Sequence, residues 1–290
     1  MAKAKCIFCG GIVDIDDAFQ EFACPICSEV GKADKAIERY QAISEESFKE
    51  KMNTKYIGDF SILDDKLLKY TGMESEVEIP AGVKIIGKEA FMDNVYVESV
   101  VLPLGAVEIE EKAFYNCESL SNILLPNSLR VIRHSVFGEC KKLRKIVLPA
   151  NIRTIERECF QNCESLVSAK LPKEITLIDW DMFENCYSLE SIEVPENVTK
   201  INWDAFKNCR SLTSISIPAN VQEIGAGAFA GCSKLQSIVV EKRKNKLVIN
   251  RNAFADTPAH DEWERMGVCQ LCGSDKNIFG KCKYCVEGFD

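Results

Sequence analysis

The sequence of 290 residues has little of what enzymes, membrane proteins and nucleic-acid-binding proteins usually carry. It holds two histidines, His134 and His260, and neither stands near a recognisable nucleophile, so the sequence predicts no acid/base catalytic site. No apolar run approaches the roughly 18 residues that cross a bilayer, and no apolar segment of a secretory signal precedes the first cysteine. The formal net charge of −8 provides no general positive field for binding phosphate backbones. We therefore expect a soluble, cytoplasmic protein that is not an enzyme, with no small-molecule substrate and no membrane partner.

Cysteine, by contrast, is abundant, with 15 residues. In a reducing cytosol, cysteines are expected to be metal ligands or buried thiols rather than disulfides. Eight of them form two sets of paired C-x-x-C motifs: Cys6, Cys9, Cys24 and Cys27 near the start, and Cys269, Cys272, Cys282 and Cys285 near the end.

Each set resembles a zinc ribbon. A C-x-x-C turn directs two thiolates at one ion, and two such turns complete a closed tetrahedral site with no open position for catalysis. We predict one structural zinc in each module, hence two per chain. Two disulfides per module are the first alternative, and rubredoxin-like iron, which Cys24-Pro25-Ile26-Cys27 would suit, is the second.

A repeat of constant length fills the middle of the chain, and the spacing from Pro80 to Pro103 is one period. The repeat places proline at Pro80, Pro103, Pro126, Pro149, Pro172, Pro195 and Pro218. The same period carries phenylalanine at Phe91, Phe114, Phe137, Phe160, Phe183, Phe206 and Phe229, and cysteine at Cys117, Cys140, Cys163, Cys186, Cys209 and Cys232. A fixed period of this length is typical of a solenoid in which each coil buries its apolar side against its neighbours.

Within each unit, the alternating I-x-φ-P portion (φ being an aliphatic residue) predicts a short strand that proline ends. The A-F-x-x-C-x-x-L portion spaces its apolar residues three and four apart, which favours a short helix that faces inward. The expected fold is thus an α/β repeat solenoid with one short strand and one short helix per coil. The six repeat cysteines occupy an inward phase, so we interpret them as core residues, and Cys159 replaces the alanine before Phe160.

This unit resembles the leucine-rich repeat of bacterial BspA-like proteins, as the stretch from Ile217-Pro218 through Phe229 to Cys232 and Leu235 illustrates. The resemblance covers about Val77 to Val240 and implies a leucine-rich repeat scaffold that binds other macromolecules. It also implies a capping hairpin before the array. Val239 to Phe254 is interpreted as a degenerate last coil in which Glu241 replaces the proline.

The predicted domain order has five parts. They are a zinc ribbon (1–31), a helical linker (32–57), an N-terminal cap hairpin (58–76), the solenoid (77–256) and a second zinc ribbon (257–290).

Two surfaces are candidates for binding a partner. Trp180 and Trp203 share one phase in consecutive coils, so their indoles are expected to lie side by side near the surface, as interface anchors or simply stacked on the outer wall. Val101, Leu124 and Val147 point outward from consecutive strands and form an apolar patch, unless another element covers it.

The leading interpretation is a protein-binding scaffold, because a solenoid offers a long surface whose outward positions vary freely. Nucleic-acid binding through the ribbons, aided by Lys242-Arg243-Lys244 and Lys246, is the alternative, although neither ribbon is basic. Gly225, Gly227 and Gly231 superficially match a nucleotide-binding loop, but they occur within the repeat and lack its βαβ context.

Overall fold

A computed structural model describes residues 54–241, 247–250 and 252–259, together with four short strands between residues 2 and 32. The chain divides into two compact units, Met1–Asp64 and Asp65–Asp290. The described residues contain no helix long and apolar enough to cross a membrane.

The described residues of the first unit form three antiparallel pairs of strands. Strand β1 (Ala2–Lys5) pairs with β2 (Ile12–Ile15), β3 (Glu21–Ala23) pairs with β4 (Val30–Lys32), and β5 (Lys55–Ile57) pairs with β6 (Phe60–Leu63). Along the sequence, Cys6 and Cys9 stand between β1 and β2, and Cys24 and Cys27 stand between β3 and β4. Most of the predicted helical linker (32–57) lies outside the described residues, and its described ends belong to strands, Lys32 to β4 and Lys55–Ile57 to β5.

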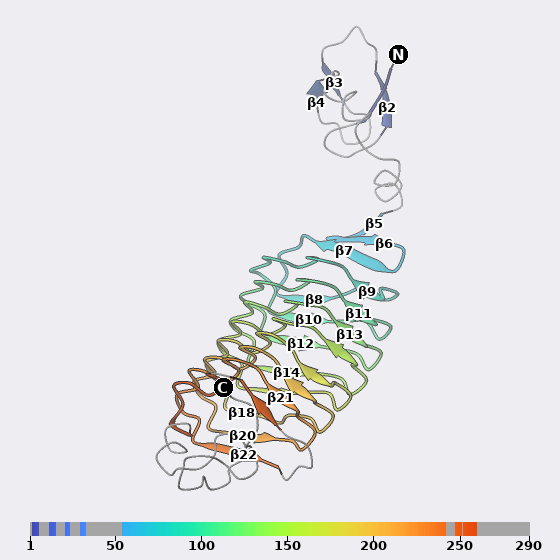
Figure 1. Cartoon of the computed structure of the whole chain (residues 1–290). Helices are drawn as coiled ribbons and strands as arrows, with labels where there is room; N and C mark the ends of the chain where they lie inside the picture. The colour runs from blue at the N-terminus through green and yellow to red at the C-terminus, as the bar shows by residue number, and fades with distance from the viewer. Residues whose placement is uncertain are drawn as a thin grey trace, which may run out of the picture. The chain divides into compact units, whose positions relative to one another are not determined.

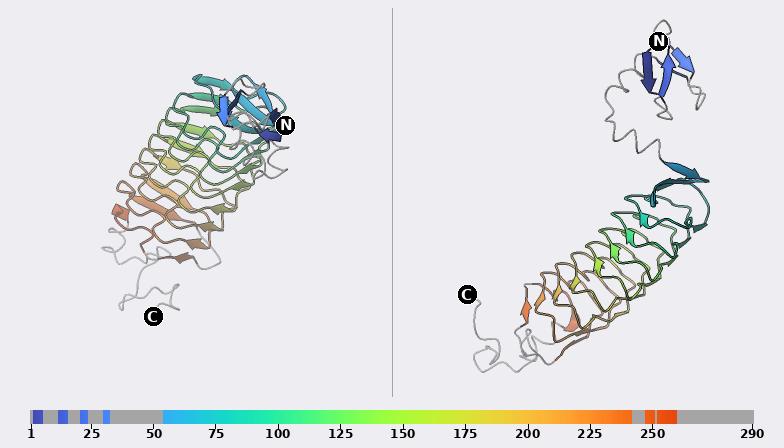
Figure 2. Two further views of the ribbon diagram at one scale, coloured as in Figure 1. Left: turned by 90° about the horizontal axis from the view of Figure 1, so that it is seen from above. Right: turned by 90° about the vertical axis from the view of Figure 1, so that its right-hand side faces the viewer.

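The second unit is a solenoid whose coils stack one after another along the chain (Figures 1 and 2). Each coil contributes two short strands, and the two kinds form separate parallel rows. The even-numbered strands are the predicted I-x-φ strands: β8 (Glu76–Glu78), β10 (Ser99–Val101), β12 (Asn122–Leu124), β14 (Lys145–Val147), β16 (Ser168–Lys170), β18 (Ser191–Ile192), β20 (Ser214–Ile217) and β22 (Ser237–Val240). Except at the two ends of the odd-numbered row, strands that pair are offset by one repeat, as in Ser168 opposite Ser191.

The odd-numbered strands form the second row, which the sequence interpretation did not include. They are β7 (Lys66–Tyr70), β9 (Ile85–Ile86), β11 (Glu108–Ile109), β13 (Val131–Ile132), β15 (Thr154–Ile155), β17 (Leu177–Ile178), β19 (Lys200–Ile201), β21 (Glu223–Ile224) and β23 (Val248–Ile249). The repeated isoleucine of each unit, such as Ile109, is the buried residue of this strand.

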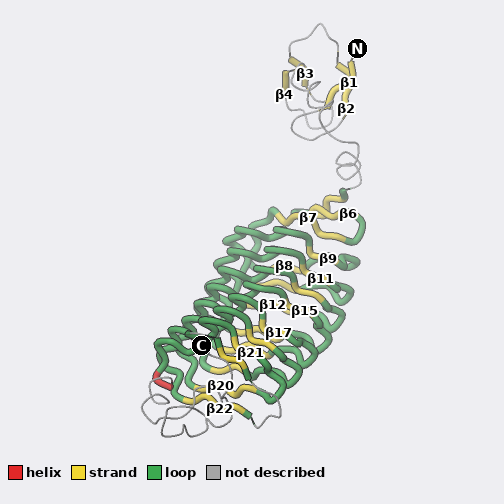
Figure 3. Tube along the Cα trace, in the orientation of Figure 1, coloured by secondary structure: helices red, strands yellow, loops and turns green. Residues whose placement is uncertain are grey.

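The predicted short helix of each coil is wrong. The A-F-x-x-C segments are turns, and among the described residues helix occurs only at 258 and 259 (Figure 3). In the coil around Phe114, the N–H groups of Lys112, Phe114 and Asn116 donate to the next coil, whereas those of Ala113, Tyr115 and Cys117 donate three residues back within their own coil. Lys112 and Asn116 both have a φ of 56°, a left-handed conformation that a right-handed helix does not contain. Hydrogen bonding between coils therefore replaces the helical pattern that the side-chain spacing favoured.

A column of aromatic rings runs through the core. Tyr70, seven phenylalanines of the repeat and Phe254 stack in order, with neighbouring ring centroids 4.8–5.7 Å apart. The degenerate last coil is confirmed, because Phe254 stacks on Phe229, and β23 pairs with β21 at an offset slightly longer than the repeat, with Val248 opposite Glu223. Glu241 stands where the earlier coils have proline, and its carboxylate accepts a hydrogen bond from the N–H of Ala219.

Candidate interaction surfaces and cysteine sites

The two candidate tryptophans lie side by side, as predicted. The rings of Trp180 and Trp203 stack with centroids 5.9 Å apart and planes at 14°, and the two residues are 43% and 56% exposed. They follow β17 and β19 at the same position of consecutive coils, so the repeat itself sets their spacing.

Polar contacts hold the backbone beneath the pair. Oδ1 of Asp179 accepts hydrogen bonds from the backbone N–H of Trp180 (2.8 Å) and from Nδ2 of Asn202 (2.9 Å). Asn202 is buried, so this amide ties together the two coils that carry the indoles. The pair is therefore a preorganised aromatic surface rather than two independent side chains.

Carboxylates surround the tryptophans. Burial, together with the charges of Glu184, Asp204 and Glu158, raises the pKa of Asp181 from 3.8 to about 6, and the cation of Lys207 opposes this shift. Lys207 forms ion pairs with Glu184 (3.1 Å) and Asp204 (3.2 Å). The edge of the aromatic surface is consequently acidic.

The glycines of the coil that follows Trp203 have a packing role. A Cβ atom at Gly225 would clash with the Trp203 ring and backbone, and one at Gly227 would clash with the Asp204 carboxylate. These glycines make room for the side chains of the preceding coil, which is in line with the interpretation that they are not a nucleotide-binding loop.

The apolar patch predicted from Val101, Leu124 and Val147 lies on the even-numbered strands. Val101 is half-buried and stands directly opposite Leu124, while Leu124 and Val147 are 57% and 60% exposed. The same outward position continues through Lys170, Glu193 and Ser216 to Val239, and these four residues are also exposed.

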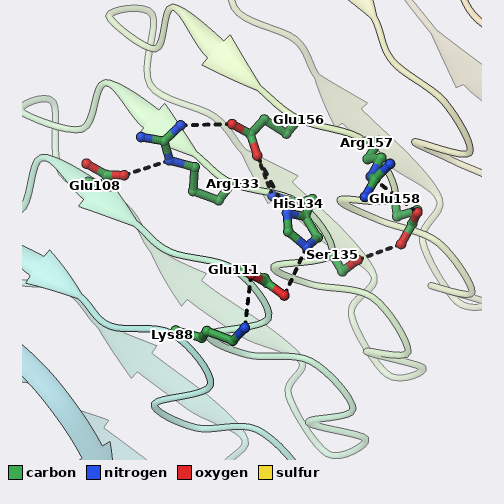
Figure 4. Close-up of polar contacts among 9 residues, drawn as sticks. All are labelled: Lys88, Glu108, Glu111, Arg133, His134, Ser135, Glu156, Arg157 and Glu158. Carbon is green, nitrogen blue, oxygen red and sulfur yellow. Dashed lines mark hydrogen bonds and ion pairs between the residues drawn. The ribbon is translucent and has the colours of Figure 1, made fainter.

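A network of ion pairs crosses the odd-numbered strands (Figure 4). Arg133 bridges Glu108 (2.7 Å) and Glu156 (2.9 Å), and His134 lies between Glu111 (3.1 Å) and Glu156 (3.7 Å). The pKa of Glu111 lies below its ordinary value. Partial burial raises this pKa, but the hydrogen bonds and charges of Lys88 and His134 outweigh burial and lower it. The neighbouring Ser135 hydroxyl donates to Glu158 at 2.8 Å rather than to His134. The network connects adjacent coils, and it contains no serine activated by the histidine.

The repeat cysteines and Cys159 are buried free thiols, as predicted. Each thiol of the column donates a hydrogen bond to a phenylalanine carbonyl of the preceding coil, as Cys163 does to Phe137 at 3.1 Å. Burial raises the pKa of the Cys117 thiol to about 12 and that of Cys163 also well above its ordinary value, so these thiols remain protonated.

The eight predicted zinc ligands, Cys6, Cys9, Cys24, Cys27, Cys269, Cys272, Cys282 and Cys285, lie outside the described residues. Within the part of the chain that is described, no group of three or more His, Cys, Asp or Glu side chains could hold a metal ion.

Sequence reasoning missed a column of asparagines in the turns. Asn185 donates to Asn162 (2.7 Å) and accepts from Asn208 (2.8 Å), and Asn116 donates to Asp93 (2.8 Å) in the same way. The signal was present, because asparagine precedes the repeat cysteine in four units. Asparagine tolerates the left-handed conformation that this position requires.

Comparison with known proteins agrees with this architecture. A family model described as "BspA type Leucine rich repeat region" matches in six copies, over residues 61–189 and 132–260. A solved leucine rich cell surface protein from Faecalibacterium prausnitzii is 32% identical with a TM-score of 0.59, and the match covers 64% of this chain and 54% of that one. The chain thus spans about half the length of that protein.

Other solved structures are more distant. A leucine rich repeat protein of T. pallidum is 23% identical, with 76% of this chain and 96% of that chain covered and a TM-score of 0.49. One from Bacteroides ovatus is 24% identical, with 69% and 67% covered and a TM-score of 0.47. No curated protein matches. On the extent of the family match, the chain belongs to the BspA-type leucine-rich repeat family.

Proposed function

We propose that the solenoid is a non-catalytic scaffold that binds another protein, with Trp180 and Trp203 as the anchor of one binding surface. The observation that carries this proposal is the stacked pair of exposed indoles. Other coils place charged residues such as Lys88, Glu111 and Arg157 at this position, so the repeat does not require an aromatic residue there. Tryptophan is enriched among interface anchors, and a rigid pair loses little conformational entropy on binding.

The test is an affinity purification from the native cell with the full chain as bait, read out by mass spectrometry. Replacing both residues (Trp180→Ala with Trp203→Ala) should reduce recovery of the specific partner by at least about tenfold, because a hot-spot residue contributes about 2 kcal/mol or more. Tyr187→Ala is the matched control, since Tyr187 is an aromatic residue of the same coil that packs under Arg210 instead. Equal recovery with the double variant and the control would refute the anchor.

The apolar patch of Val101, Leu124 and Val147 remains a second predicted contact surface. What supports it is the exposure of Leu124 and Val147.

We also propose a structural zinc ion in each terminal module. In the N-terminal module, each C-x-x-C motif stands between the two strands of an antiparallel pair, the arrangement that a ribbon requires. Metal analysis of the purified chain should give two zinc ions per chain, and chelation should unfold the ribbons but not the solenoid. Well under two zinc ions per chain would contradict the assignment.

Nucleic-acid binding through the ribbons is the alternative, and retention on DNA or RNA that falls steeply with salt would favour it. The cytoplasmic location is likewise a proposal. The Faecalibacterium relative is described as a cell surface protein, so fractionation of the native cell tests it.

A further inference from the structure

The net charge reverses its sign across three consecutive coils. Residues 126–148 contain six Lys or Arg and one Glu, residues 149–171 contain three of each sign, and residues 172–194 contain one Lys and six Asp or Glu. The solenoid therefore changes from basic to acidic about a neutral central coil.

On the even-numbered strands this pattern is exposed and unpaired. Arg144 and Lys145 belong to the basic coil, Lys170 to the central coil, and Glu190 and Glu193 to the acidic coil. All five are exposed, and within the described residues no ion pair involves any of them. The odd-numbered strands differ, because there Arg133 and Lys200 pair with carboxylates of neighbouring coils.

The centre of this face is hollow. Ser168 and Ser191 present small side chains between Lys145, Lys170 and Glu193, and these residues line a shallow depression of about 350 Å³. The hollow leaves room for long side chains of an opposing surface.

The register of the coils places one pair of opposite charges, Arg144 and Glu190, at matching positions. The N–H of Val167 donates to the carbonyl of Arg144 (2.9 Å), and the N–H of Glu190 donates to the carbonyl of Val167 (3.1 Å). Arg144, Val167 and Glu190 therefore occupy the same position in three consecutive coils. A half-turn about an axis that lies in the face and runs along β16 exchanges the first coil with the third and keeps each position along the strand. It brings Arg144 of one chain opposite Glu190 of another.

We propose that this face, defined by Arg144, Lys145, Lys170, Glu190 and Glu193, binds a second copy of the chain, with the two solenoids antiparallel about that axis. Arg144 of each copy then meets Glu190 of the other, and the pair occurs twice, as a two-fold interface requires. In projection on the face, Lys145 lies about 6.6 Å along the strand from Glu193 of the other copy. The two Lys170 residues meet at the axis, where their like charges repel, and Glu193 of both copies lies one coil spacing, about 4.8 Å in the same projection, from each of them and opposes this repulsion.

A ligand of one charge fits this face less well. An anion bound at Arg144 and Lys145 would be repelled by the carboxylates of Glu190 and Glu193 two coils away. A cation bound at these carboxylates would likewise be repelled by Arg144 and Lys145. A surface that carries the same pattern in reverse order neutralises both ends, and the chain itself provides one.

The tryptophan surface follows the odd-numbered strands, so this interface is separate from the proposed tryptophan anchor, whereas it shares the outward face of β14 with Val147 of the apolar patch. If the dimer interface is disproved, the proposed tryptophan anchor is unaffected, and the reverse also holds.

Sedimentation velocity of the full chain tests the interface over about 5–200 µM protein, the range in which a small interface associates. The wild-type chain should dimerise at low ionic strength and dissociate near 1 M salt, where the Debye length falls to about 3 Å. Two charge-reversed variants, R144E with K145E and E190K with E193K, should each be monomeric. Mixed in equal amounts, they should form a heterodimer, because both ends of the face then meet opposite charges.

Lys142→Glu with Arg153→Glu is the control, since it reverses two exposed cations outside the face and should leave dimerisation unchanged. Where a double reversal unfolds the chain by circular dichroism, Arg144→Ser and Glu190→Ser replace it. Each should weaken dimerisation about tenfold, and the two combined should weaken it no further, because either substitution already removes the pair. A wild-type chain that stays monomeric, or variants that do not associate when mixed, would overturn the proposal. A monomer that binds DNA at low salt would point to an anionic partner instead.

Discussion

The phenylalanine column inside the solenoid and the outward column that starts at Lys88 obey different constraints. The inner column repeats one side chain in seven consecutive coils. The outer column changes at almost every coil, from Lys88 through Glu111, His134 and Arg157 to the tryptophans and Ala226. A buried ring must fill the same space in each coil, whereas an outward side chain contacts mainly solvent and its neighbours along the column.

The difference shows where functional information lies. Repetition inside the coil follows from packing and says nothing about a partner. In this outer column tryptophan is the one side chain that occurs twice in succession, at Trp180 and Trp203, and packing does not require it. The charge pattern across the even-numbered strands is equally free of packing constraints.

The largest effect is expected when the inner column is interrupted. Phe160→Ala removes a fully buried ring that stacks on Phe137 (5.6 Å) and Phe183 (5.2 Å), and should lower the free energy of unfolding by about 3–5 kcal/mol. Arg157→Ala, in the outer column of the same coil, should change it by less than about 0.5 kcal/mol. Urea denaturation measures both, and similar losses would remove the contrast between the columns.

Much of the inner column could be predicted from the sequence. A constant period that carries phenylalanine and cysteine requires those side chains to face one core, and both columns are buried as expected. Placing Trp180 beside Trp203 needed only the same period.

The turns could not be predicted in this way. The spacings of four residues from Ala113 to Cys117 and of three from Phe114 to Cys117 suit a helix equally well, and only hydrogen bonds to the next coil decide against it. Lys112 and Glu158 adopt the left-handed conformation although neither residue type favours it, because the stacked coils impose it. The ion pairs of Arg133 with Glu108 and Glu156 depend on long side chains in adjacent coils, and they become visible only once the register is known.

The asparagine column is neither as buried as the phenylalanine column nor as exposed as the outer column. Interrupting it should therefore lower the free energy of unfolding by an intermediate amount. Asn185→Ala removes two hydrogen bonds between coils and places a Cβ-bearing residue without a polar side chain at φ 59°, so we expect a loss of about 2 kcal/mol. Asn185→Gly removes the same hydrogen bonds but accepts the conformation, so its loss should be smaller by about 1 kcal/mol. Urea denaturation compares the two, and a glycine variant less stable than the alanine variant would contradict this account.

The smallest effect concerns the acidic edge of the tryptophan surface and depends on pH. Burial and three neighbouring carboxylates raise the pKa of Asp181 to about 6 in the folded chain, against 3.8 for an ordinary aspartate, so the folded chain binds more protons than the unfolded chain between these values. Its contribution to stability therefore falls as pH rises from about 4 to above 6. Asp181→Asn removes this dependence and tolerates the φ of 54°, so it should be more stable than the wild type at pH 8, by at most about 1 kcal/mol after solvent screening. Thermal unfolding at pH 4 and pH 8 tests this: the advantage of the variant should appear only at the higher pH, and an equal difference at both values would show that the carboxylate of Asp181 is not destabilised by its surroundings.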